Sequence, residues 1–195
     1  MGVAPIGHID RRELLTKLFP DQLDWLFISG LAGASKDTAA LTSDGANSLT
    51  MAGTMGAAVP MGLGLALSAP KHKVAVITGD GEMLMGIGAL VTVAAAKPPN
   101  LSIVCIDNAM HGETGGQRGH TGRTSNLKTI AEGAGIESTK VICDPQDIPA
   151  AAEFLSAISG PRFLLCRVLE SAPSAHKRNM DLTECRLRFR RAFSS

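Results

Sequence analysis

Short apolar runs rich in β-branched residues alternate along the chain with longer stretches that have helical character. The runs predict strands at residues 25–29, 73–78, 101–107, 139–142 and 162–169. The stretches between them predict helices at residues 10–18, 55–68, 82–97, 126–133 and 146–158. The third helix should stop at Pro98, because proline has no N–H to continue it. This alternation indicates an α/β fold, a three-layer α/β/α arrangement around a mostly parallel sheet.

The length and composition of the chain suit one soluble domain, residues 1–195. Of the 195 residues 45% are hydrophobic and 19% are charged, so the chain can bury a core of its own. Residues 171–195 form a basic tail that carries a run of charges from Arg186 to Arg191. For this run, a solvated helix face or a partner-docking segment is favoured over an anion site.

Composition argues against nucleic acid and membranes as partners. The net charge is +1 and only 4% of the residues are aromatic, so bases would find few rings to stack on. Residues 51–69 are almost uncharged and nearly long enough to span a bilayer. They contain several glycines and Pro60, however, and Lys71 and Lys73 follow soon after. We expect a buried small-residue helix packed closely against the sheet.

The cysteines and the N-terminus bear on the location of the protein. Cys105, Cys143, Cys166 and Cys185 are widely separated and show no metal-ligand spacing. Free thiols in a reducing cytoplasm are the simplest interpretation. The first eight residues lack the basic and then apolar pattern of a secretory signal. We therefore expect a cytoplasmic protein.

A glycine turn, Gly79-Asp80-Gly81, follows one predicted strand and opens a helix. Such a turn commonly holds phosphate on backbone N–H groups. Two nucleotide motifs are excluded, because Leu84 occupies the place of the third glycine of GxGxxG and no P-loop lysine is present. Asp80 would repel a bound diphosphate unless a divalent cation lay between them. Since Mg²⁺ takes oxygen ligands from carboxylates and phosphates, the turn predicts a magnesium site.

A second metal ligand should lie at the carboxyl end of the neighbouring strand. There, Asp107 and Asn108 follow Gly81 after 25 intervening residues. This spacing resembles the diphosphate-binding motif of the thiamine diphosphate enzyme family. The resemblance implies thiamine diphosphate and Mg²⁺ as cofactors. It also implies that Asp80, Asn108 and the backbone carbonyl of Met110 hold the metal.

Residues 52–60 are similar to the stretch that holds the aminopyrimidine in this family. The resemblance implies that the Gly53 carbonyl accepts a hydrogen bond from the 4′-amino group. It also implies that Met55 lies under the cofactor and enforces its bent shape. The complete set of cofactor-binding residues expected in this way is Gly53, Thr54, Met55, Gly79, Asp80, Gly81, Glu82, Met83, Asn108, Met110, His111 and Gly112.

The likeness to this family covers only one of its two related domains. One domain grips the diphosphate, and the other supplies a glutamate to N1′ of the pyrimidine. The resemblance spans roughly residues 10–170, which leaves no room for a second domain of that size. It therefore implies a separate pyrimidine-binding α subunit as partner.

Within the family, the chain resembles the β subunit of sulfopyruvate decarboxylase and the matching half of phosphonopyruvate decarboxylase. The likeness rests on residues 52–56, 79–85, 106–108 and 112–117. It implies decarboxylation of an anionic small-molecule 2-oxo acid to CO₂ and an aldehyde. Two alternatives stay open: a carboligase or lyase subunit similar to acetolactate synthase, and a non-catalytic cofactor-binding subunit. The intact Asp80 and Asn108 argue against the second.

The loop after Asn108 supplies the candidate catalytic residues His111, Glu113 and His120. An imidazole can transfer a proton near neutral pH, although an exposed or structural role is the alternative for each histidine. An arginine of this loop could pair with a sulfonate or phosphonate. Gly115 and Gly116 form either a hinge or a tight turn. The basic stretch 118–123 departs from the decarboxylase pattern, and this departure leaves the substrate open.

Overall fold

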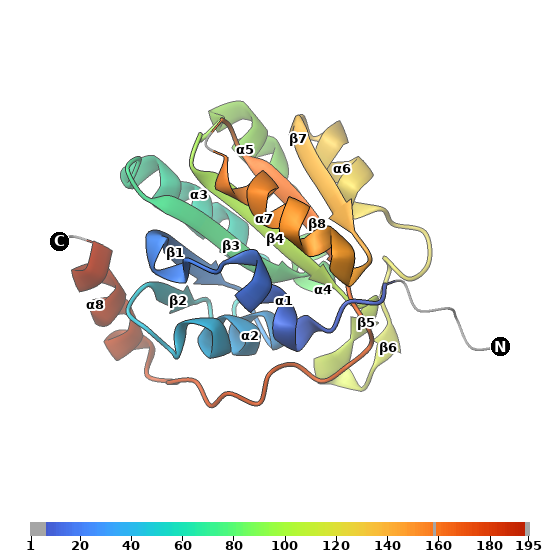
Figure 1. The fold of residues 1–195 in the computed structure, drawn as a ribbon, viewed down its shortest axis with the longest axis horizontal. Coiled ribbons are helices and arrows are strands. Elements are labelled where there is room, and N and C mark those ends of the chain that lie inside the picture. Colours follow the sequence, from blue (N-terminus) through green and yellow to red (C-terminus); the bar gives the residue numbers. More distant parts are fainter. Residues whose placement is uncertain (1–6, 158, 194–195) are drawn as a thin grey trace.

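The computed structural model describes residues 7–157 and 159–193, and a six-stranded sheet lies at its centre (Figure 1). Its strands run in the order β2-β1-β3-β4-β8-β7, and every pairing is parallel. The predicted α/β class is therefore confirmed. The bounds are β1 Trp25–Ser29, β2 Ser48–Thr50, β3 Lys73–Gly79, β4 Leu101–Asp107, β7 Ser138–Ile142 and β8 Arg162–Arg167.

Helices cover both faces of the sheet, which gives the expected three layers (Figure 1). Helices α1, α2 and α7 lie on one face, and α3, α5 and α6 lie on the other. The bounds are α1 Arg11–Leu18, α2 Gly33–Thr42, α3 Ala58–Ser68, α4 Asp80–Met85, α5 Ala89–Ala96, α6 Leu127–Gly133, α7 Ile148–Ser156 and α8 Leu182–Phe193.

Each face of the sheet has its own hydrophobic core, because successive side chains along a strand point to opposite sides. Val76 of β3 packs with α3, α5 and α6, whereas its neighbour Ile77 packs with α1, α2 and α7. Helix α3 approaches β3 closely at Gly62, where an added Cβ would lie 2.1 Å from Cγ2 of Val76. The predicted close packing of a small-residue helix is confirmed. Its burial is only partial, since Met61 and Leu67 are exposed.

The carboxyl ends of the parallel strands meet at one edge of the sheet. The register pairs Gly79 of β3 with Ile106 of β4, so Asp80 and Asp107 follow at neighbouring positions. A short hairpin of β5 (Met110–His111) and β6 (Gln117–Arg118) lies at the same edge (Figure 1). The fold therefore gathers the motif residues in one place.

Several boundaries differ from the prediction. The helix predicted at residues 82–97 is two helices, α4 and α5, because the chain breaks at Gly86, where an added Cβ would lie 2.3 Å from the carbonyl oxygen of Gly56. The helix predicted from residue 55 begins at Ala58, since Ala52 and Gly56 adopt positive φ angles. Strand β8 ends at Arg167, two residues early.

Two elements, α2 and β2, have no counterpart in the prediction. Helix α2 is built largely from small residues, and β2 has only three residues, so neither shows a clear hydrophobic period. The remaining predicted helices and strands are present within two residues of their expected starts. The expected absence of a secretory signal concerns the first eight residues, of which residues 1–6 lie outside the described part of the chain, as does the predicted helix end at residue 158.

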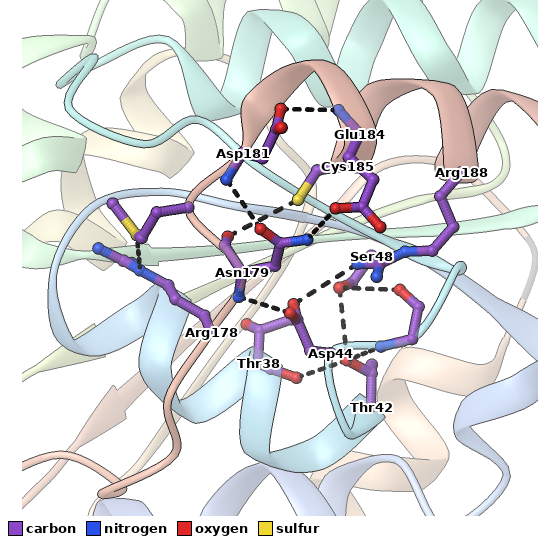
Figure 2. A network of polar contacts seen from close by, with 12 residues as sticks. Thr38, Thr42, Asp44, Ser48, Arg178, Asn179, Asp181, Glu184, Cys185 and Arg188 are labelled. Atoms are coloured by element: carbon purple, nitrogen blue, oxygen red, sulfur yellow. Dashed lines mark hydrogen bonds and ion pairs between the residues drawn. The ribbon is translucent and has the colours of Figure 1, made fainter.

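The C-terminal tail runs along α2 and ends in α8, which packs beside β2 (Figure 1). Its course is fixed by the Asn179 N–H, which donates to Oδ2 of Asp44 at 2.6 Å (Figure 2). Helix α8 buries Cys185 and Phe189, while its arginines Arg186, Arg190 and Arg191 are exposed. The basic run thus lies on an exposed helix face, which agrees with both predicted alternatives, a solvated face and a partner-docking segment.

Within residues 7–157 and 159–193, no helix combines the length and the apolar character that crossing a bilayer requires.

Candidate cofactor site

Asp80 is the first residue of α4 and lies directly after the end of β3. It is only 4% exposed. Burial, followed by the charge of the neighbouring Asp107, raises the pKa of Asp80 to about 6, and hydrogen bonds from Thr121 and Gly81 oppose this rise. A carboxylate in such surroundings is stabilised by a bound cation, which supplies the positive charge that the buried group lacks.

Asp107 ends β4 and is completely buried. Its Oδ1 accepts hydrogen bonds from the Ala109 N–H at 2.9 Å and from the Thr121 hydroxyl at 2.7 Å. Its Oδ2 forms an ion pair with Nη1 of Arg167 at 3.2 Å. Burial raises the pKa of Asp107, and Arg167 opposes that rise. Contacts within the protein therefore engage both oxygens of the Asp107 carboxylate, and this carboxylate stabilises the turn that follows β4.

That turn presents Asn108 and Met110 at the carboxyl edge of the sheet. Ala109 between them has a φ of 60°, a left-handed conformation that costs energy for any residue with a Cβ. Oδ1 of Asn108 accepts the Met110 N–H at 3.1 Å. An amide oxygen has a second lone pair, which is available to a cation. The Met110 side chain packs near Gly116 within the hairpin, so its carbonyl is the group it can offer a metal.

The hairpin brings His111 onto the glycine turn. A Cβ added at Gly81 would lie 3.2 Å from Nδ1 of His111, so the ring sits directly over this glycine. The rings of His111 and His120 are 6.5 Å apart between centroids. Gly116 has a positive φ, and its N–H donates to the His111 carbonyl at 3.0 Å. This geometry is that of a tight turn, one of the two alternatives for Gly115 and Gly116.

Glu113 forms an ion pair with α2. Its Oε1 lies 3.7 Å from Nζ of Lys36 on α2, and both side chains are exposed. Gly112 precedes it in a short 3₁₀ turn with open space around its Cα. Of the three candidate catalytic residues, His111 and His120 thus lie together, whereas Glu113 forms a separate ion pair that links the loop to α2.

Glu82 and Met83 belong to the interior of the protein. Oε2 of Glu82 accepts hydrogen bonds from the Leu31 N–H at 3.0 Å and the Thr78 hydroxyl at 3.1 Å. Burial raises the pKa of Glu82. Its Oε1 is buried without a well-aligned hydrogen bond. Met83 is part of the core on the α3 side of the sheet. Oε2 of Glu82 and the Met83 side chain therefore stabilise the fold, and the backbone groups of both residues remain for a ligand.

The segment expected to hold the aminopyrimidine is accessible. Gly53, Thr54 and Met55 are all exposed, and Met55 is 39% exposed. Nothing lies within 4 Å of a Cβ position at Gly53. The adjoining Gly56 carbonyl packs on Gly86, immediately after α4. The segment thus packs against the end of α4, the helix that begins with Asp80, and residues 53–55 of the segment remain exposed.

Two residues of the site have no counterpart in the sequence hypothesis. Thr121 bonds both Asp80 and Asp107, and Arg167 pairs with Asp107. Arg167 had a signal in the sequence, because it is a charged residue between the apolar residues Cys166 and Val168 of a predicted strand. Thr121 had none, since a threonine in a polar loop matches no spacing rule.

The residues present fit a metal and a diphosphate, as judged from their chemistry. Among the described residues, no three His, Cys, Asp or Glu side chains gather into a metal-binding cluster. A cation at this edge would instead use the Asp80 carboxylate, the Asn108 amide oxygen and a backbone carbonyl. Hard oxygen ligands of this kind, completed by phosphate and water, suit Mg²⁺.

The chain is similar in sequence to proteins that are named as decarboxylases. The chain is 48% identical over 88 residues to sulfopyruvate decarboxylase subunit beta of Methanocaldococcus jannaschii, which covers 45% of this chain and 46% of the relative. It is 38% identical over 114 residues to phosphonopyruvate decarboxylase of Streptomyces hygroscopicus, covering 58% and 28%. The matches thus span about half, or less, of the length of these two relatives.

The fold also has a counterpart among solved structures. The thiamine diphosphate-dependent 4-hydroxybenzoylformate decarboxylase of Rhodococcus jostii RHA1 superposes with a TM-score of 0.65 at 21% identity, over 88% of this chain and 34% of that one. The family model described as thiamine pyrophosphate enzyme, C-terminal TPP binding domain, matches residues 33–166. Thiamine pyrophosphate is the older name of thiamine diphosphate, and the chain belongs to this family of thiamine diphosphate enzymes.

Proposed function

We propose that this chain is the diphosphate- and Mg²⁺-binding subunit of a two-chain thiamine diphosphate-dependent decarboxylase. The observation that carries the proposal is Asp80, a buried carboxylate with a raised pKa at the strand edge where Asn108 also lies. Burying such a group is costly unless a positive charge compensates it. A divalent cation held by Asp80 would meet that need.

The metal ligands we assign are the Asp80 carboxylate, the Asn108 amide oxygen and the Met110 carbonyl. Backbone groups of Gly79, Gly81, Glu82 and Met83 at the start of α4 would lie along the diphosphate. The exposed Gly53, Thr54 and Met55 would hold the aminopyrimidine, with Met55 beneath the cofactor. When bound, thiamine diphosphate would supply a carbanion that adds to a ketone and a ring that takes up the electron pair of the C–C bond broken as carbon dioxide leaves.

The substrate class we propose is a 2-oxo acid with a second strong anion, sulfopyruvate or phosphonopyruvate. Two relatives carry the names of decarboxylases for these compounds. In this chain, the loop over the site is basic, with Arg118, His120 and Arg123 close together in sequence. Guanidinium groups suit sulfonate and phosphonate oxygens, because they donate two parallel hydrogen bonds.

Proton transfer falls to the histidine pair in this proposal. His111 lies over Gly81 of the metal-binding turn, and His120 lies beside it. An imidazole at this place can hold the proton that the aldehyde product gains after the carboxylate carbon is lost. Glu113, paired with Lys36, would position the hairpin and contribute charge at its rim.

The partner we propose is a pyrimidine-binding subunit that supplies the activating glutamate. The relative from M. jannaschii is named a beta subunit, and this chain keeps its aminopyrimidine segment open toward solvent. We place the complex in the cytoplasm, in keeping with the free thiols of its four cysteines.

The experiment that tests this function begins with recovery of the natural partner by affinity capture on the full chain. The complex is then loaded with Mg²⁺ and thiamine diphosphate, and CO₂ release is followed from a panel of 2-oxo acids. We expect the two dianionic substrates to be turned over with an aldehyde as product. A coupled C–C product would identify a carboligase instead, and cofactor binding without any turnover would identify a non-catalytic subunit.

A further inference from the structure

The loop after the hairpin closes directly onto the proposed metal ligand. Thr121 in this loop is 7% exposed, although its neighbours His120 and Arg123 are exposed. Its hydroxyl lies 3.0 Å from Oδ2 of Asp80 and 2.7 Å from Oδ1 of Asp107. The Thr121 side chain thus lies between two carboxylates, that of Asp80 directly after β3 and that of Asp107 at the end of β4.

Glycines on either side of Thr121 allow this close approach. A Cβ added at Gly119 would lie 3.1 Å from Oδ2 of Asp80, and one added at Gly122 would lie 2.9 Å from Cβ of Ala109. The Gly119 N–H also donates to the Ala109 carbonyl at 2.6 Å. The loop is therefore pressed against both the glycine turn after β3 and the strained turn after β4.

We propose that Thr121 is a positioning residue, which fastens the basic loop of residues 118–125 to the carboxylate that binds the metal. The proposal rests on the proposed function, because it concerns the same site. Thr121 itself does not touch the substrate. It acts through the loop, whose basic side chains it holds at the edge of the sheet beside Asp80.

The hydroxyl of Thr121 has a single proton, and this limits which carboxylate it can donate to. Both neighbours are carboxylates, which accept hydrogen bonds when ionised and cannot donate. The proton therefore serves one carboxylate at a time, and the shorter distance is the one to Asp107. Asp107 is in turn held by Arg167 at 3.2 Å. This chain of contacts ties the loop to β4 and β8 and keeps it in place when a cation occupies Asp80.

The attachment also sets the loop's internal structure. The carbonyl of His120 accepts the N–H groups of Arg123, Thr124 and Ser125 at 3.0 to 3.1 Å, which forms a tight turn around Thr121. The His120 ring is within 6.5 Å of the His111 ring, between centroids. Releasing Thr121 would free this turn and, with it, the position of His120 relative to His111.

Two substitutions at this position separate the hydroxyl from the shape of the side chain. Thr121→Val keeps the volume and removes the proton donor, whereas Thr121→Ser keeps the donor and removes a methyl group. The first measurement is amide hydrogen exchange of residues 119–125 in the full chain without cofactor. The second is calorimetric affinity for thiamine diphosphate with Mg²⁺ in the assembled two-chain complex.

We expect Thr121→Val to speed exchange of these amides about tenfold and to weaken cofactor affinity about tenfold, since a hydrogen bond to a buried carboxylate is lost. Thr121→Ser should stay within about threefold of the wild type in both measurements. Gly122→Ala should resemble Thr121→Val, because its Cβ pushes the loop from Ala109 while the hydroxyl remains. This variant preserves the test if Thr121→Val does not fold.

The outcomes separate cleanly. Wild-type behaviour of Thr121→Val in both measurements overturns the inference, and so does a serine variant as impaired as the valine variant. Faster exchange with unchanged cofactor affinity overturns the link between the loop and the metal site. If the wild-type complex itself fails to bind thiamine diphosphate, the proposed function fails, while the exchange comparison still decides whether Thr121 fastens the loop.

Discussion

The carboxylate of Glu82 fills the space where a side chain at residue 30 would lie. A Cβ added at Gly30 would be 1.6 Å from Oε2 of Glu82. Glu82 uses this closeness to accept the N–H of Leu31, and it also accepts the hydroxyl of Thr78. One buried carboxylate therefore joins the end of β1 to the end of β3, next to the proposed metal ligand.

The first prediction concerns this junction. Gly30→Ala should displace Glu82 and destabilise the protein by about 2 kcal/mol, the usual range for overpacking a buried site. We expect weaker binding of thiamine diphosphate and Mg²⁺ as well, because α4 begins two residues before Glu82. Urea denaturation of the full chain measures the first effect, and calorimetry of the complex measures the second.

Gly64→Ala is the matched control for Gly30→Ala. Gly64 lies within α3, and a Cβ there meets nothing within 4 Å. Alanine is favoured over glycine inside a helix by about 1 kcal/mol, so this variant should be as stable as the wild type or more stable. Equal losses in the two variants would mean that Gly30 has no special contact with Glu82.

The second prediction concerns the metal. Asp80→Ala should abolish Mg²⁺-dependent binding of thiamine diphosphate to the complex, since the carboxylate is the only charged ligand that we assign. The fold should persist, because removing a buried charge also removes its desolvation cost. Calorimetry with and without Mg²⁺ measures the effect. Asp24→Asn, at an exposed position before β1, is the control and should bind normally.

The third prediction is a dependence on pH. In the cofactor-free protein, the pKa of Asp80 rises from 3.8 to about 6, so the folded state holds this proton more tightly than the unfolded state. The stability that Asp80 contributes is therefore present below about pH 3.8 and is lost as the pH rises through about 6. Protons compete with Mg²⁺ for the same carboxylate, so metal affinity should fall about tenfold for each pH unit below about 6.

Two measurements check this dependence. Unfolding free energy of the cofactor-free chain is compared with that of Asp80→Asn between about pH 4 and about pH 7, and the variant should lose part of the slope. Calorimetric titration of the wild-type complex with Mg²⁺ at fixed thiamine diphosphate gives the affinity over the same range. An affinity that stays constant down to about pH 5 would contradict the assignment of Asp80 as the ligand.

Sequence patterns predicted the parts of this protein that repeat a simple rule. β1 and β4 have the predicted bounds, because each is a mostly apolar run that is buried along its whole length. The glycine turn and the Asp107-Asn108 pair were found together because parallel strands bring their carboxyl ends to one edge. The break at Gly86 was not predictable in this way, since it depends on contact with Gly56 far away in the sequence.

The directions of individual side chains also could not be predicted from the sequence. Local sequence patterns do not indicate that the Glu82 side chain turns toward Leu31, because this direction depends on the space left by Gly30. Thr121 reaches the site from a loop with no hydrophobic period, where spacing carries no information. Contacts of this kind form only when distant segments fold together, so no local pattern encodes them.

The last prediction concerns α8, which lies beyond the residues 33–166 that match the family. Phe189 is 6% exposed and joins the core on the α3 side of the sheet, where its ring stacks on Phe193. Phe189→Ala should lower the unfolding free energy by about 3 kcal/mol, because a large buried ring is removed. Leu187→Ala, in the same helix but 41% exposed, should cost less than about 1 kcal/mol. Similar losses in urea denaturation of the two full-length variants would show that α8 is held by its ion pair between Arg188 and Asp44 instead of by this buried face.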